Sequence, residues 1–314
     1  MKNTFALLTL SLLSLNSMAG IDGVYGDDNR QDVYQSKSSL HKKLAKSTAA
    51  MIHGGYFAKT DKPNVFNIQG ARTLEQGQNI CSSEKFSQQP AVAGCSGFLV
   101  SPNTIVTAGH CFASGGNPEA ECQNKVWVFD FALESNSTDP TRNIPITNIY
   151  LCKKVVKVAF NANQDFAIIK LDRPVFGRDS LKFRTSGKIS SGSDLVTIGH
   201  PSGLPSKITN AGKVTDNSAS DRFSTNLDTF HGNSGSAVFH SQSGLVEGIL
   251  IQGKPDYVAS IQSNPTSCKV VNTCDNTGKN CKKDYPDENN PTKKGEVVYR
   301  ITNIVKDIEA AIKL

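Results

Sequence analysis

From about residue 91 onward, the chain alternates short apolar runs with polar turn residues. The runs are of strand length, rich in β-branched and aromatic residues, and bounded by Gly, Pro, Asn, Asp or Ser, which is typical of β-strands. Many short strands at this spacing predict an all-β barrel or sandwich. The clearest predicted strands are residues 98–100, 104–106, 126–129, 155–160, 166–171, 195–198 and 246–251.

Helical periodicity is convincing only at the C-terminal end of the chain. Ile301, Ile304, Val305, Ile308 and Ile312 recur at steps of three and four residues. This spacing places them on one apolar face and predicts a C-terminal α-helix.

The N-terminal end has the pattern of a secretory signal peptide. Lys2 precedes an apolar run over residues 5–15, and small residues follow at 17–19. The run is shorter than the ~20 apolar residues that span a bilayer, so no membrane anchor is expected. The pattern predicts residues 1–19 as the signal, cleavage after Ala19, and export to the periplasm or the medium.

The remaining chain is predicted to be a short N-terminal segment and one large domain. Residues 20–50 are polar and are either the start of the mature protein or a pro-segment, with Lys42, Lys43 and Lys46 as a suitable cleavage site. Residues 51–314 form the domain. Within it, residues 254–299 are predicted to be a cysteine-containing surface insertion, because they hold too little apolar material for a separate core.

Cysteine content and charge narrow the function classes. Eight cysteines in an exported chain predict disulfides. The spacing of Cys268, Cys274 and Cys281 does not fit the usual zinc motifs, so no metal site is expected. The net charge of +6 is spread along the chain without a basic stripe, so nucleic acid is not an expected partner.

Three local segments carry candidate chemistry: TAGHC at 107–111, QDFAII at 164–169 and GNSGS at 232–236. A serine hydroxyl needs a neighbouring base to become a nucleophile, and a histidine can supply it near neutral pH. A buried acid then orients the imidazole and stabilises its cation. We therefore predict Ser234, His110 and Asp165 as nucleophile, base and orienting acid. The glycines around Ser234 allow a tight turn that aims the Gly232 and Ser234 amides at one oxyanion.

The three segments, in this order, resemble the signature of trypsin-like serine peptidases. The resemblance covers roughly residues 45–314. It looks closest to the bacterial glutamyl-endopeptidase-like branch, which has GNSGS where animal enzymes have GDSGG. The stretch YGDDNR at 25–30 also resembles the mature start of that branch.

The resemblance implies two six-stranded antiparallel β-barrels followed by a C-terminal helix, and no cofactor. It also implies a disulfide between Cys95 and Cys111. Fifteen pairings stay open for the six other cysteines, which are Cys81, Cys122, Cys152, Cys268, Cys274 and Cys281.

The same resemblance places the substrate-binding residues. The pocket floor is expected at Asp228, next to Thr229, and the opposing wall at Leu250, Ile251 and Gly253. A carboxylate at the floor favours Arg or Lys before the scissile bond, unless the Asp228 side chain points away and only hydrogen-bonds the turn. Glutamate specificity is the alternative, although glutamate-specific relatives carry a histidine where Leu250 aligns, and a buried unpaired charge is costly.

Activation of the animal type is not expected, because the residue before the nucleophile is Asn233 and cannot pair with a freed N-terminal amine. The predicted protein is a monomeric serine endopeptidase acting on proteins or peptides. Two alternatives are an esterase with the same triad and a catalytically silent, protease-like binding protein. The usual mark of such a binding protein is a missing triad residue, and none is missing here.

Overall fold

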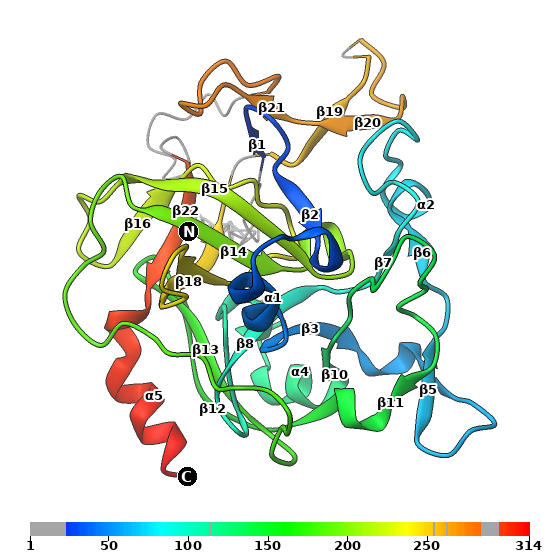
Figure 1. Ribbon diagram of the computed structural model, residues 1–314, viewed down its shortest axis with the longest axis vertical. Helices are drawn as coiled ribbons and strands as arrows, with labels where there is room; N and C mark the ends of the chain where they lie inside the picture. Colours follow the sequence, from blue (N-terminus) through cyan, green and yellow to red (C-terminus); the bar gives the residue numbers. More distant parts are fainter. Residues whose placement is uncertain (1–22, 114, 254, 262, 284–294) are drawn as a thin grey trace, which may run out of the picture.

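The computed structural model describes residues 23–113, 115–253, 255–261, 263–283 and 295–314. The predicted signal peptide at 1–19 and its cleavage site lie outside the described residues. Figure 1 shows two groups of strands, with the C-terminal helix at the lower edge of the molecule.

Six antiparallel strands close the first barrel in the order β10-β12-β13-β9-β8-β3. Its interior is filled by large apolar side chains that are fully buried, among them Phe98, Phe129 and Trp127. The strands are β3 (Thr48–His53), β8 (Cys95–Ser101), β9 (Thr104–Thr107), β10 (Lys125–Phe129), β12 (Ile149–Asn161) and β13 (Gln164–Leu171).

Six further antiparallel strands form the second barrel, in the order β14-β17-β18-β22-β16-β15, and the pairing of β14 with β15 closes it. The predicted architecture of two six-stranded barrels is thereby confirmed. The strands are β14 (Asp194–Gly199), β15 (Lys207–Asp216), β16 (Arg222–Thr225), β17 (Ala237–His240), β18 (Val246–Gln252) and β22 (Glu296–Arg300).

The predicted C-terminal helix is confirmed as the 3₁₀ turn η6 (Ile301–Ile304) followed by α5 (Val305–Ile312). Ile301, Ile304 and Ile308 are buried as the periodicity requires, whereas Ile312 is 42% exposed at the frayed end. The other helices are α1 (Ser39–Ala45), α2 (Leu74–Gln78), α3 (His110–Ala113), α4 (Pro118–Asn124) and the 3₁₀ turns η1 (Val33–Gln35), η2 (Gly54–Tyr56), η3 (Ile146–Asn148) and η4 (Pro201–Gly203). Among the described residues, no helix has the length and apolar character to cross a membrane.

The N-terminal segment is integrated into the fold. Strand β2 (Arg30–Asp32) pairs with β15 as a seventh strand of the second sheet. Asp32 also forms an ion pair of 2.6 Å with the buried Lys207. Strand β3 of the first barrel begins at Thr48 and crosses the predicted boundary at residue 51. Residues 23–50 therefore belong to the same folded unit as the rest.

The predicted insertion consists of short strands outside both barrels. They are β19 (Tyr257–Ala259), β20 (Lys269–Val271) and β21 (Thr273–Cys274), seen beside β1 (Val24–Tyr25) at the top of Figure 1. The insertion ends earlier than predicted, because β22 already belongs to the second barrel. The small remaining strands are β4 (Phe57–Lys59), β5 (Val65–Ile68), β6 (Arg72–Thr73), β7 (Pro90–Ala91) and β11 (Ile144–Pro145).

Every cysteine is in a disulfide. The structure joins Cys95 to Cys111, the pairing that the resemblance implied. The six cysteines left open pair as Cys81–Cys268, Cys122–Cys152 and Cys274–Cys281. The first of these bonds spans 187 residues and ties the insertion to the segment that precedes β8.

Candidate active site

His110 and Asp165 form a hydrogen-bonded pair at the edge of the first barrel. His110 opens α3 and Asp165 is the second residue of β13. One carboxylate oxygen accepts the His110 backbone N–H at 2.9 Å, and the other lies 2.8 Å from Nδ1 of the ring. With a carboxylate oxygen opposite it, Nδ1 carries the proton of the neutral ring and donates it in a hydrogen bond, which leaves the Nε2 lone pair free.

The residue before His110 must be a glycine for this pairing to form. A Cβ on Gly109 would lie 2.0 Å from the Ala159 carbonyl oxygen and 2.8 Å from the Phe166 amide nitrogen. Both neighbours are backbone atoms of the β12–β13 hairpin and cannot move aside cheaply. The close approach brings the hairpin, and with it Asp165, against the His110 turn.

Ser234 lies in a turn that packs between the two barrels. Its carbonyl oxygen accepts the Ser96 amide at 2.8 Å from the first barrel. On the other side, the Gly235 amide donates to the Leu250 carbonyl at 2.9 Å in β18. Gly235 has φ +85°, and a Cβ there would meet Thr107 Oγ1 at 2.1 Å. The turn therefore requires glycine both for its backbone conformation and for its contact with the first barrel.

The backbone before the nucleophile leaves two amides available. Among the described residues, neither the Gly232 nor the Ser234 N–H donates a hydrogen bond within the protein. Gly232 has φ +91°, and a Cβ there would lie 2.5 Å from the His200 carbonyl oxygen. The Gly232 carbonyl accepts the Ser96 hydroxyl at 2.8 Å, which fixes the adjoining peptide. Such donors, held in place and unpaired, suit a developing oxyanion.

Within the described residues, the Ser234 hydroxyl and the His110 ring are not hydrogen-bonded to each other. Bonds of this kind are often long in a ligand-free site and shorten when substrate binds. Both residues adjoin the Cys95–Cys111 disulfide: Cys111 Sγ lies 3.9 Å from the Ser234 carbonyl oxygen. Cys95, His110 and Cys111 also place possible ligand atoms within 4.8 Å of one another, but sulfurs joined in a disulfide offer no thiolate to a metal.

Asp228, the predicted pocket floor, is hydrogen-bonded to the N-terminal segment. Its side chain is 1% exposed, and its two oxygens accept the backbone amides of Tyr25 at 2.8 Å and Asn29 at 2.7 Å. Burial raises the pKa of this carboxyl to about 7. The carboxylate therefore holds the N-terminal segment, an arrangement that sequence reasoning missed because the partners lie 199 and 203 residues away.

The other predicted wall residues lie beside the nucleophile turn. Leu250 accepts the Gly235 amide and donates its own amide to the Ser236 carbonyl at 3.0 Å. Its side chain is buried in the core of the second barrel, and Ile251 and Gly253 are buried as well. Thr229 is fully buried and donates its hydroxyl to Glu296.

Two residues of the site were missed from the sequence. Ser96 is fully buried and connects the His200 amide, at 3.0 Å, to the Gly232 carbonyl. Its position directly after Cys95 was the available signal. Glu296 is fully buried beside Thr229, and no signal pointed to it, because it follows a polar run that is typical of a surface loop.

Comparison with known families agrees with this geometry. Residues 95–249 match the trypsin-like peptidase domain. The chain carries a trypsin-like peptidase domain. The predicted class, a trypsin-like serine peptidase, is confirmed at this level. The matched range contains His110, Asp165 and Ser234.

Individual relatives of the trypsin-like domain are distant. A curated relative, the extracellular metalloprotease of Bacillus subtilis (strain 168), is 31% identical over 84 residues, which is 27% of this chain and 25% of the relative. The match thus spans a quarter of the relative's length. The solved structure of a Glu endopeptidase in complex with MPD shares the fold, with 18% identity, a TM-score of 0.50, and coverage of 93% of this chain and 100% of that one. The Vibrio cholerae VesB protease matches at 11% identity and a TM-score of 0.49, covering 90% of this chain and 66% of its own.

Proposed function

We propose that this protein is a serine endopeptidase that cleaves peptide bonds through an acyl-enzyme, with Ser234, His110 and Asp165 as its catalytic residues. The observation that carries the proposal is the hydrogen-bonded His110–Asp165 pair beside a turn whose Gly232 and Ser234 amides are unpaired. No cofactor takes part in this chemistry.

The reaction begins when His110 Nε2 takes the proton of the Ser234 hydroxyl as its oxygen attacks the substrate carbonyl carbon. The resulting oxyanion accepts hydrogen bonds from the Gly232 and Ser234 amides. Each of these bonds stabilises the transition state by ~3–4 kcal/mol. His110 then gives the proton to the leaving amine as the C–N bond breaks. A water molecule, deprotonated by the same ring, then attacks the acyl carbon. The ring returns that proton to Ser234 Oγ as the ester C–O bond breaks and the acid is released. Asp165 orients the ring and stabilises its cation in both halves.

A preference for Arg or Lys before the scissile bond accompanies this proposal. Asp228 forms no ion pair among the described residues, although Arg30 is close enough to offset part of the rise that burial causes in its pKa. Glu296, which accepts the Thr229 hydroxyl, is a second fully buried acid next to this loop. When ionised, the Asp228 carboxyl would favour a cationic substrate side chain and oppose a glutamate by like charge. Specificity for glutamate remains the competing hypothesis.

Export from the cell is also proposed. The signal-peptide pattern, four disulfides and an extracellular relative support it. We further infer that the mature protein keeps residues 23–50. Cleavage at Lys46 would remove β2 and the buried Arg30 and Asp32, which are part of the folded unit.

The test combines active-site labelling with a peptide library. A fluorophosphonate should label the exported protein and fail to label Ser234→Ala. Library cleavage should follow Arg or Lys and vanish in the same variant. Cleavage after Glu would keep the triad and reject the proposed specificity. Ester hydrolysis without any peptide cleavage would favour an esterase, and absence of labelling would favour a binding protein.

A further inference from the structure

The loop that leads to the nucleophile is bound on its outer side by the N-terminal segment. Asp228 at its start accepts the amides of Tyr25 and Asn29. The next residue, Thr229, donates its hydroxyl to one oxygen of Glu296, whose other oxygen accepts the Tyr25 hydroxyl at 2.7 Å. Tyr25 therefore contacts the loop twice, directly through its backbone and indirectly through a buried carboxylate.

Phe230 and His231, the next two residues of the loop, also contact other segments of the chain. The Phe230 ring is fully buried, and the guanidinium carbon of Arg30 lies 3.7 Å from its centroid. The backbone amide of His231 donates to Asp256 of the insertion at 3.0 Å. Each of the four residues before Gly232 thus bonds to, or stacks on, a residue of the N-terminal segment, of β22 or of the insertion.

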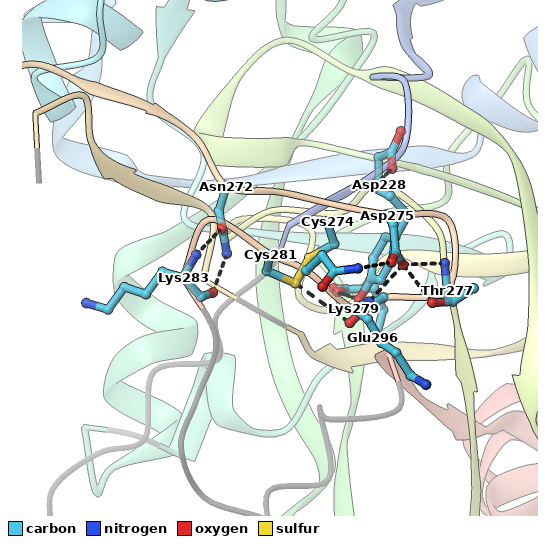
Figure 2. Close-up of a disulfide and its surroundings, with 12 residues drawn as sticks. Asp228, Asn272, Cys274, Asp275, Thr277, Lys279, Cys281, Lys283 and Glu296 are labelled. Atoms are coloured by element: carbon cyan, nitrogen blue, oxygen red, sulfur yellow. Dashed lines mark hydrogen bonds between the residues drawn. A yellow bond between two sulfur atoms is a disulfide. The ribbon is translucent and has the colours of Figure 1, made fainter.

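The insertion holds the N-terminal segment in place. Strand β1 runs parallel to β21, with the Val24 amide donating to Asn272 and the Gly26 amide to Cys274, both at 3.0 Å. The Cys274–Cys281 disulfide closes the turn that follows β21. Figure 2 shows this disulfide in close-up, with Asp228 and Glu296 among the residues drawn around it. The segment lies between the insertion and the loop, so we call residues 24–30 the clamp segment.

We propose that Tyr25 and Glu296 are positioning residues for the oxyanion amides, and that the clamp segment orders the nucleophile loop without a freed N-terminal amine. This inference rests on the proposed function, in which those amides bind the oxyanion. Stabilisation of an oxyanion requires donors that are already in place, because reorganisation during the reaction would consume the gain. Gly232 has little conformational restriction of its own. The loop residues on the N-terminal side of Gly232 must therefore be held in place by their partners. The ion pair with a freed N-terminal amine that does this in the animal enzymes cannot form here, because the residue before Ser234 is Asn233.

The decisive variant is Tyr25→Phe, which removes the hydroxyl bond to Glu296 and keeps the aromatic ring. Tyr34→Phe is the matched control, since its hydroxyl also lies in the N-terminal part of the chain but bonds to Asn136 on an exposed loop. Glu296→Gln is the second test variant, because an amide keeps one acceptor for the two donors. The exported, full-length protein is used throughout.

Three quantities are measured: the rate constant for fluorophosphonate labelling, kcat and KM for the best peptide of the library, and hydrogen exchange of the amides at 228–234. For Tyr25→Phe we expect labelling and kcat to fall about tenfold, KM to stay within about twofold, and exchange to accelerate about tenfold. A selective loss in kcat indicates an interaction made in the transition state. Glu296→Gln should show the same pattern to a smaller degree, and Tyr34→Phe should match the wild type.

Unchanged exchange and unchanged kcat in Tyr25→Phe would overturn the clamp while leaving the proposed function intact. A rise in KM alone would also overturn it, because the residues would then act in substrate binding. If the wild type is not labelled, the proposed function fails. In that case exchange alone decides whether the clamp segment orders the loop.

Discussion

The buried ion pair between Lys207 and Asp32 offers the sharpest test of how the N-terminal segment is held. The Lys207 ammonium donates to Asp32 at 2.6 Å, to Gln89 at 2.7 Å and to the Pro205 carbonyl at 2.9 Å. The lysine is 1% exposed and Asp32 is 3% exposed. Lys207→Met keeps the length and apolar stem of the side chain but removes the charge, so Asp32 is left buried without its cation.

Removing one partner of a buried pair costs about 3–5 kcal/mol, because the remaining charge is uncompensated. For a chain of about 300 residues, the entropy of unfolding is about 0.6 kcal/mol/K, so Tm should fall by roughly 5–8 °C. Replacing both partners, as in Asp32→Leu with Lys207→Met, should cost much less than the single change, since no unpaired charge remains.

The assay is urea unfolding at pH 7, followed by far-UV circular dichroism and by fluorescence of Trp127, the single tryptophan of the chain. Lys42→Met, at an exposed lysine, serves as the control and should change stability by less than about 0.5 kcal/mol. A loss below about 1 kcal/mol for Lys207→Met would refute the reasoning. So would a double variant that is less stable than the single one.

Three other changes test the site. Asp165→Asn should lower kcat roughly 10⁴-fold with the fold intact, since an amide nitrogen cannot accept the Nδ1 proton; a loss under tenfold in titrated enzyme would reject Asp165 as the orienting acid. Gly109→Ala should lower kcat at least about 10²-fold, because its Cβ would force the His110 turn away from the hairpin; steady-state rates near wild type would contradict this. The folded protein retains a proton on Asp228 that the unfolded chain has released, so the free energy of unfolding should decrease as pH rises from about 4 to about 7, by roughly 4 kcal/mol at most. Asp228→Asn should flatten this slope in urea titrations, and an unchanged slope would exclude Asp228 as its source.

The strands that could be predicted are those that contain a long apolar run. Burial alone was not enough, because β3 and β22 are buried along most of their length and were not among them. Strand β13 is buried along nearly its whole length and was found directly. Strand β15 was not, because its sequence KITNAGKVTD is largely polar and its Lys207 is buried by a specific ion pair. A hydrophobic pattern cannot indicate a polar residue that enters the core with its partner.

The same distinction applies to the site. His110, Asp165 and Ser234 each lie in a local motif with a chemical reason for its residues, so they could be proposed from the sequence. The partners of Asp228 could not be found in this way. They are backbone amides, which any residue type supplies, and they are brought near by the pairing of β1 with a strand of the insertion.

The Cys81–Cys268 bond determines what a single proteolytic cut, including one made by another copy of this peptidase, does to the molecule. His110, Asp165 and Ser234 all lie between these two cysteines in the chain. A single cut at any exposed loop within that span produces two fragments that stay covalently joined. The fragments cannot diffuse apart, so a nicked molecule can retain an assembled triad. Nicking would then be visible as two bands on a reducing gel and as one band without reductant.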